Sequence, residues 1–193
     1  MNALLICFDE TKRDNYISLL KSAGVTDVET SSGEDARTLA RERWYGLVLS
    51  VLPFEHEFGL DTVAYISGRT ASEQVVFVPS KVYDEVCSKA VGLPVSILPK
   101  NVSVSIAVNT IRRAVSVKES LDRAKSENDD LRRKADEDKL IYRAKCVLIE
   151  YLKIPENEAH RYLQKRAMDR QSPMADIALE VLKTYGYREG LDD

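Results

Sequence analysis

The residues best suited to contact a ligand are basic, and they gather in the last third of the chain. Residues 143–170 hold seven basic residues against four acidic ones, although the whole chain has a net charge of −3. Four of the polar or long side chains share one helical face: Arg161, Gln164, Lys165 and Met168. Arginine and glutamine suit base edges, and lysine suits phosphates. The face indicates a nucleic-acid contact, with a solvated helix face as the alternative.

No other group of residues indicates catalysis or metal binding. The three cysteines, Cys7, Cys87 and Cys146, share no close spacing, and only two histidines are present, so no zinc pattern exists. We expect the cysteines to be small buried hydrophobic residues in a reducing environment. The first half has neither a catalytic triad nor a Gly-rich phosphate loop. We therefore expect a protein that is not an enzyme, with no cofactor and no metal.

The N-terminal residues carry no targeting pattern. The stretch MNALLICFDE lacks a basic segment and a long apolar run, so we expect no signal peptide. No apolar run reaches 18 residues, so we expect no membrane span. The hydrophobic content of 44% is ordinary for a globular protein. These features predict a cytoplasmic protein.

The elements that position these residues differ between the two halves of the chain. Residues 1–115 alternate short apolar runs with amphipathic stretches. The runs predict strands at 3–8, 25–29, 47–52, 75–78 and 95–98. The stretches between them predict helices at 11–23, 34–43, 60–67 and 82–90, and a further helix begins near Val102. Five such strands favour an α/β fold with a doubly wound parallel sheet, whose strand C-terminal ends form one functional rim.

The helix that begins near Val102 meets no helix breaker before Pro155, so it spans roughly 50 residues. From Ala114 to Asp138 its apolar residues fall alternately three and four apart, which is the spacing of a coiled-coil seam. Asn128 occupies an a position, where a lone Asn sets a parallel two-stranded register. A solvated connector helix is the alternative. The predicted dimer contacts are Val117, Leu121, Ala124, Asn128 and Leu131.

Beyond Asp138 the apolar face of the helix widens, and two shorter helices follow. The first is predicted at 155–169, with Pro155 in its first turn. The second begins after Ser172-Pro173 and ends at Gly186. These three helical segments predict a small all-α bundle. The predicted domains are residues 1–115, a coiled-coil linker at 116–139, and a helical domain at 140–193.

The helical domain resembles the ANTAR domain, an RNA-binding antiterminator module of response regulators. The matching groups are Arg143-Ala144-Lys145, Glu158-Ala159, Tyr162-Leu163, Ala167-Met168 and Asp176-Ile177-Ala178. The resemblance implies binding to two consecutive stem-loops of a nascent mRNA leader, which prevents a terminator hairpin from forming. A dimer suits two loops. The candidate RNA contacts are Arg143, Lys145, Arg161, Gln164, Lys165, Arg166 and Arg170.

Three positions depart from the ANTAR pattern. Cys146 stands where Gly is usual, and Pro155 stands where a capping Ser or Thr is usual. Both changes concern packing or capping. Gln164 stands where Arg is usual, so one expected RNA contact is altered, although Lys165 and Arg166 follow directly.

Residues 1–115 resemble the receiver domain of response regulators in the order of their elements. That family requires a pair of acids after the first strand, a phosphoacceptor Asp after the third, a hydroxyl after the fourth and a Lys before Pro after the fifth. Here Phe8-Asp9 stands at the position of the acidic pair, and Ser50 and Val51 stand at the position of the acceptor Asp. The last pair is present in inverted order, as Pro99-Lys100. The degenerate phosphorylation site is thus Asp9, Ser50, Ser80 and Lys100. A Ser hydroxyl does not replace a carboxylate in this chemistry, so the resemblance implies a pseudo-receiver.

The leading hypothesis is a homodimeric RNA-binding antitermination regulator that acts without phosphorylation and responds to a sensor or adaptor protein. The alternative is a dimeric protein-interaction adaptor in which the helices only dimerise and no RNA is bound. A DNA-binding regulator is a third hypothesis, although no helix has the pattern of a recognition helix. In a variant of the first hypothesis, a small molecule at the rim replaces phosphate as the input.

Overall fold

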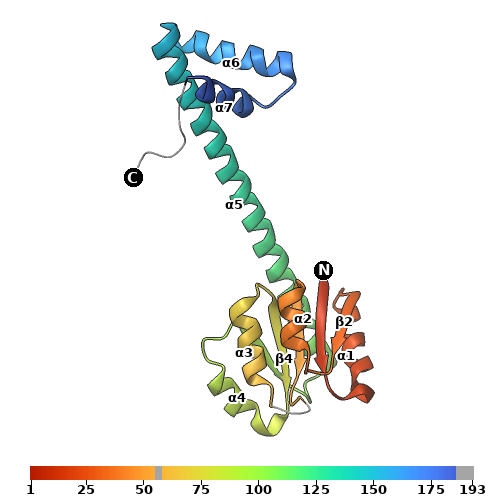
Figure 1. Ribbon diagram of the computed structural model, residues 1–193. Helices are drawn as coiled ribbons and strands as arrows, with labels where there is room; N and C mark the ends of the chain where they lie inside the picture. The colour runs from red at the N-terminus through yellow and green to blue at the C-terminus, as the bar shows by residue number, and fades with distance from the viewer. Residues whose placement is uncertain (55–57, 186–193) are drawn as a thin grey trace. The chain divides into compact units, whose positions relative to one another are not determined.

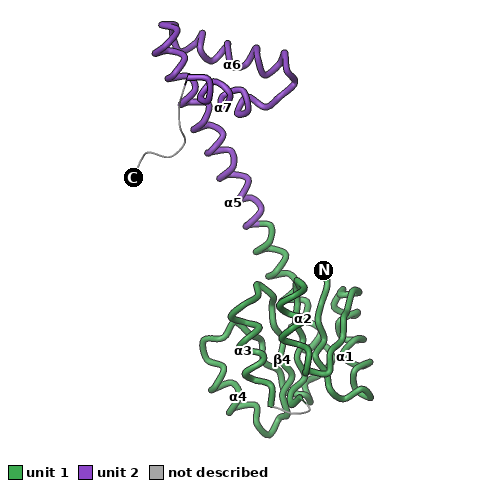
Figure 2. The backbone as a smooth tube through the Cα atoms, viewed as in Figure 1, with its two compact units in different colours: residues 1–123 green, residues 124–193 purple. Residues whose placement is uncertain are grey.

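The computed structural model describes residues 1–54 and 58–185, which form two compact units. The first unit is residues 1–123 and the second begins at Ala124 (Figure 2). The long helix α5 (Val104–Leu152) contributes residues to both units. Among the described helices, none combines the length and the apolar character needed to cross a membrane.

The first unit contains a five-stranded parallel sheet with helices on both faces (Figure 1). The order of the strands across the sheet is β2-β1-β3-β4-β5. Their bounds are β1 (Asn2–Cys7), β2 (Asp27–Ser31), β3 (Leu47–Val51), β4 (Glu73–Val78) and β5 (Val95–Pro99). This architecture confirms the predicted α/β class.

Four helices of the first unit lie between its strands, and α5 follows the last strand. They are α1 (Glu10–Ser22), α2 (Ala36–Glu42), α3 (Leu60–Arg69) and α4 (Tyr83–Lys89), with a short 3₁₀ turn η1 (Ser80–Val82) before α4. Helices α1 and α5 pack on one face of the sheet, and α2, α3 and α4 pack on the other. Because side chains alternate along a strand, Leu5 joins the first layer and Leu4 the second. Both faces are covered, which explains the continuous apolar run of β1.

The second strand lies two residues later than its sequence pattern predicted. Val25, the first residue of the predicted strand, is buried but lies in the turn after α1, where its N–H donates to the carbonyl of Leu20 (2.9 Å). The strand itself is Asp27–Ser31 and pairs only with β1. β2 is an edge strand, and most of its side chains are not buried. Its sequence therefore lacks the continuous apolar run of the central strands.

The second unit packs the C-terminal part of α5 against α6 (Glu156–Arg170) and α7 (Met174–Thr184). Its buried side chains are Ala144, Leu148, Ala159, Leu163, Ile177, Ala178, Val181 and Leu182. Helix α6 ends at Gln171, whose left-handed backbone (φ 52°) lets the N–H of Ser172 reach the carbonyl of Ala167. The predicted long helix and the two helices after it are confirmed. Gly186, the predicted end of the last helix, lies outside the described residues.

Two side chains on the C-terminal part of α5, Cys146 and Tyr151, are exposed. Cys146 lies two residues from both Ala144 and Leu148, which are buried, so its side chain projects from the opposite side of α5. The expectation of burial is correct for Cys7 and wrong for Cys146. Tyr151 is also exposed, but its ring lies 4.9 Å from that of Tyr185, measured between centroids.

Candidate functional sites

Apolar side chains fill the C-terminal edge of the sheet. In register, Cys7 of β1 is paired with Val51 of β3, and Val51 is paired with Phe77 of β4. All three are buried in one cluster with Tyr16, whose ring centroid lies 5.1 Å from that of Phe77. Mg²⁺ binding and aspartyl phosphorylation require carboxylate oxygens, which these strand-end side chains do not supply.

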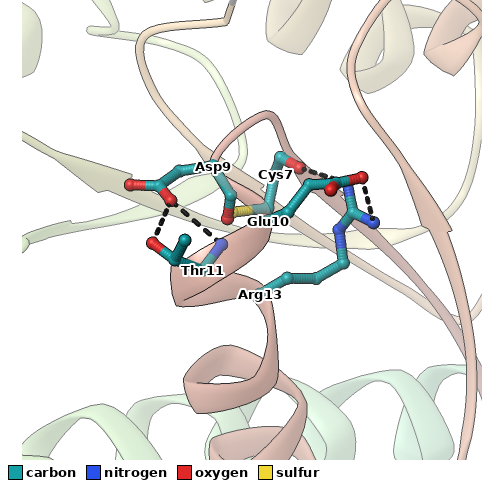
Figure 3. Close-up of polar contacts among 5 residues, drawn as sticks. All are labelled: Cys7, Asp9, Glu10, Thr11 and Arg13. Carbon is teal, nitrogen blue, oxygen red and sulfur yellow. Dashed lines mark hydrogen bonds and ion pairs between the residues drawn. The ribbon is translucent and has the colours of Figure 1, made fainter.

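Asp9, the acid that remains after β1, caps helix α1 (Figure 3). Its Oδ1 accepts hydrogen bonds from the Thr11 N–H (3.1 Å) and the Thr11 hydroxyl (2.6 Å). Its Oδ2 lies 2.6 Å from the ammonium of Lys12. Both carboxylate oxygens are therefore engaged by the first turn of α1, where an aspartate cap stabilises the helix.

Arg13 connects the same turn to the end of β1. Its Nη2 donates to the carbonyl of Cys7 (3.3 Å), and its Nη1 lies 3.5 Å from Oε1 of Glu10 (Figure 3). Burial raises the pKa of the Cys7 thiol, although the Arg13 charge acts in the opposite direction. The side chain of Cys7 is therefore a neutral thiol at neutral pH.

The cap predicts a loss of stability in acid. The bonds from Lys12 and Thr11 lower the pKa of the Asp9 carboxyl from its usual 3.8 to about 2. A lowered folded-state pKa means that this contribution is complete above pH 3.8 and is lost as the pH falls toward 2. We expect Asp9→Asn, which keeps a capping oxygen but no charge, to be less stable than the parent at neutral pH. In urea unfolding the difference should shrink at about pH 2.5, and a constant difference would contradict the ion pair.

Ser50 lies apart from the rim. It is fully buried in β3 between Leu49 and Val51, which face α1 and α5, so its side chain points to the layer of α2, α3 and α4. Within the described structure its hydroxyl has no hydrogen-bond partner. A kinase or phosphodonor has no access to this hydroxyl in the folded unit.

Ser80 and Lys100 lie after β4 and β5. The exposed Ser80 hydroxyl donates to Oδ1 of Asn101 (2.6 Å). Partial burial lowers the pKa of Lys100, and the nearby charge of Lys12 adds to this effect. The charge of Asp9 acts on Lys100 in the opposite direction, so these two predicted site residues are close enough to interact.

The second unit presents an exposed polar face on α6. Ala159 and Leu163 are fully buried against α5 and α7, whereas Arg161, Gln164 and Lys165 are exposed. Among the residues that the structure describes, these three side chains form no hydrogen bond or ion pair within the chain. Met168 lies on the same face and is 72% exposed. We call the three polar residues with Met168 the α6 face.

Two other predicted RNA contacts form ion pairs within the second unit. The ammonium of Lys145 lies 2.6 Å from Oε1 of Glu156, across the turn between α5 and α6. That bond lowers the pKa of the Glu156 carboxyl. Arg170, at the end of α6, pairs with both carboxylate oxygens of Glu180 on α7. These cations tie the helices together, so less of their charge is available to a ligand.

The last two predicted contacts are partly buried. The guanidinium of Arg166 lies over the ring of Tyr162, 5.3 Å from its centroid. Arg143 is partly buried on α5 and has a partner within the described chain. The structure thus brings Arg161, Gln164 and Lys165 together and places the other four predicted residues in internal contacts.

Residues 129–182 match the family model described as the ANTAR domain. The second unit contains an ANTAR domain. The match begins inside α5, before the apolar face widens. The transcriptional regulatory protein PdtaR of Mycobacterium tuberculosis is 28% identical over 185 residues, covering 95% of this chain and 90% of that protein.

The first unit has the fold of receiver domains. A receiver domain of a putative LuxO repressor from Vibrio parahaemolyticus superposes with a TM-score of 0.53 at 14% identity, covering 64% of this chain and 95% of that one. A second structure is a protein from a streptococcal family of redox sensors that evolved from two-component response regulators. It superposes with a TM-score of 0.54 at 19% sequence identity, covering 64% of this chain and 55% of that one. The receiver fold and the ANTAR domain together are the architecture of an ANTAR response regulator.

Tyr142 is an ANTAR-domain residue that the sequence did not single out. It is 62% exposed on α5, and the Lys145 ammonium lies 5.7 Å from its ring centroid. An exposed aromatic ring beside a cation is a platform on which an unpaired base can stack. The sequence signal that could have indicated its exposure is its position two residues before Ala144. That spacing places Tyr142 on the opposite side of α5 from the buried Ala144.

The predicted coiled-coil residues lie on α5, from Val117 in the first unit to Leu131 near the start of the ANTAR match. All five are exposed. The exposed fraction is 57% for Leu121 and 65% for Leu131. Ala114, assigned to the same seam, is buried in the core of the first unit instead. The seam is therefore open only from Val117 onward.

Proposed function

We propose that this chain is a transcription antitermination regulator that binds RNA through its ANTAR domain. In this role it holds tandem stem-loops of a nascent mRNA leader in the cytoplasm, and it acts by binding rather than by catalysis. The observation that carries the proposal is the α6 face, whose Arg161, Gln164 and Lys165 are exposed and unengaged within the described chain.

The chemistry of the α6 face suits a hairpin loop. Bases in a loop expose their hydrogen-bonding edges, which arginine and glutamine side chains can read, whereas lysine contacts the phosphates. The exposed ring of Tyr142 adds a stacking surface in the same domain. Ion pairs such as Lys145–Glu156 fix the helices that present these groups.

The apolar edge of the sheet supports a mode of action that does not use phosphorylation. Cys7 and Val51 stand at the ends of β1 and β3, and Asp9 is engaged as a helix cap. Without a phosphoacceptor carboxylate, this edge offers no route to an aspartyl phosphate. The input to the regulator is therefore a different one.

Dimerisation through the α5 seam completes the proposal, because two consecutive loops require two ANTAR domains. The exposed leucines of the seam give each copy an apolar stripe, and Asn128 favours a parallel pair in register. Sedimentation of the complex should find two chains on each tandem stem-loop RNA. One chain on each RNA would contradict this part of the proposal.

RNA binding is tested by titrating the full chain against a tandem stem-loop RNA at several salt concentrations. We expect Arg161→Ala/Lys165→Ala to weaken binding by about tenfold or more, because it removes a base contact and a phosphate contact. The slope of log affinity against log salt should fall by about 0.7 to 0.9 for each phosphate contact that is lost, because the variant releases fewer counterions when it binds.

Lys139→Ala/Lys183→Ala is the matched control, because it removes two exposed charges from α5 and α7. It should leave affinity within about threefold of the parent. Equal losses in both double variants would show only a general electrostatic attraction. No binding by the parent at low salt would overturn the proposal.

A further inference from the structure

A cavity of about 420 Å³ lies in the first unit between α1 and the start of α5. The aromatic side chains of Tyr16 and Phe77 line it together with Leu19 and Ala107. Lys12 and Lys100 line it as well. Its volume falls within the range of small-molecule sites, and its combination of apolar walls with a few polar groups is typical of them.

The lysines give the cavity an excess of positive charge. Lys12 is paired with Asp9 at 2.6 Å, so its charge is largely balanced. Lys100 has no ion pair within the described residues; partial burial and the like charge of Lys12 lower its pKa, and the charge of Asp9 acts in the opposite direction. An anion beside Lys100 would relieve both the repulsion and the partial loss of hydration.

Tyr16 contributes a hydrogen-bond donor to the same cavity. Its ring packs on Phe77, and no described group accepts a hydrogen bond from its hydroxyl. Burial raises the pKa of Tyr16 to about 12, so the hydroxyl keeps its proton at neutral pH. The Tyr16 oxygen is not among the described polar atoms that are sealed from solvent, so a ligand oxygen in the cavity can reach the hydroxyl and accept its hydrogen bond.

We propose that this cavity binds a small organic carboxylate with an aromatic or short aliphatic body. The carboxylate lies at Lys100 and the Tyr16 hydroxyl, and the apolar body packs against Phe77, Leu19 and Ala107. Carboxylates fit because ammonium and hydroxyl donors both favour charged oxygen acceptors. This site is separate from the RNA contact and does not depend on it.

The position of the cavity links a ligand to the helix that enters the ANTAR domain. Val102, Val104 and Ala107, which line it, belong to the beginning of α5 or immediately precede it. A bound carboxylate would therefore contact the first turns of α5 directly. Such a ligand is a chemical input that the receiver fold can accept in place of phosphate.

The test uses phenylacetate as the probe on the full chain, with binding followed by ligand-observed NMR and by the thermal midpoint. Two matched compounds separate the contributions: phenylacetamide keeps the ring without the charge, and acetate keeps the charge without the ring. We expect each to bind about tenfold or more weakly than phenylacetate. Equal binding of phenylacetamide would overturn the role of charge, and equal binding of acetate would overturn that of the apolar walls.

Three variants locate the site. Lys100→Met should weaken phenylacetate binding about tenfold, and Tyr16→Phe, which removes only the hydroxyl, about threefold. Lys21→Met removes an exposed charge near the other end of α1 and should leave binding unchanged. If Lys100→Met binds like the parent while its thermal midpoint without ligand is unchanged, the proposed site is wrong. RNA binding by the same variants, measured separately, should equal that of the parent.

Discussion

Val51→Asp, which places a carboxylate at the end of β3, is expected to destabilise the first unit by about 3 kcal/mol or more. Val51 is buried between Cys7 and Phe77, and the cluster around it supplies apolar neighbours. A carboxylate in this position loses its hydration among apolar neighbours, so it will take up a proton and its pKa will rise. Restoring the acceptor residue type therefore should not restore phosphorylation by a small phosphodonor such as acetyl phosphate.

Val51→Asn is the matched control, because it has the same shape and no charge. The raised pKa of the folded Asp variant means that its stability falls, relative to the Asn variant, as the pH rises above about 4. Urea unfolding at several pH values measures this difference, and intact-mass analysis reports phosphorylation. A stable Asp variant that becomes phosphorylated would show that the edge of the sheet can still accommodate the reaction.

Leu148→Ala is expected to destabilise the ANTAR domain by about 2 to 5 kcal/mol, because it leaves a cavity at the centre of a small core. Leu148 is fully buried among Ala144, Leu163 and Ile177. A unit of this size has little stability to lose, so RNA binding should disappear with the fold. Hydrogen exchange should show lost protection in α6 and α7 while the strands of the first unit stay protected.

Leu152→Ala provides the control on the same helix, one turn later. Its side chain is partly exposed, so the change should cost about 0.5 kcal/mol or less and leave RNA binding intact. The selective effect follows from the separate buried clusters, which share no residue between the two units among those described. Equal loss of protection in both units would instead mean that they unfold as one.

The order of elements was predictable because both halves carry strong local patterns. Strands β1 and β3 are buried on both faces, so their sequences are continuous apolar runs. Helix α5 has no Gly or Pro over its 49 residues, so the sequence predicted one continuous helix. The bounds of the edge strand β2 were predicted wrongly because its side chains are mostly not buried and carry no apolar pattern. Its position is set by its pairing with β1.

The state of the candidate sites could not be read from residue types. The sequence shows an acid at Asp9, but only the fold shows that Thr11 and Lys12 occupy both of its oxygens. Likewise, a serine at position 50 says nothing about the face of the sheet to which it points. Spacing correctly grouped Arg161, Gln164 and Lys165, because a single helix carries all three.

The α1–α5 cavity depends on residues that are far apart in the sequence. Tyr16 comes from α1 and was not among the predicted site residues, and Phe77 comes from β4. The sequence predicts Lys100 only as part of a degenerate phosphorylation site. Their shared position arises from the order of parallel strands, which no local pattern reveals.

Trp44 gives this protein an optical signal of its own. It is the only tryptophan in the chain, and its ring lies 5.2 Å from the ammonium of Lys118 on α5. That lysine is only 3% exposed and pairs with Asp122 at 2.7 Å. Because indole emission responds to a nearby charge, the fluorescence of the unlabelled chain reports whether this stretch of α5 stays seated against the first unit. Ligand or RNA can then be added and the state of that contact followed in real time, without a dye or an engineered probe.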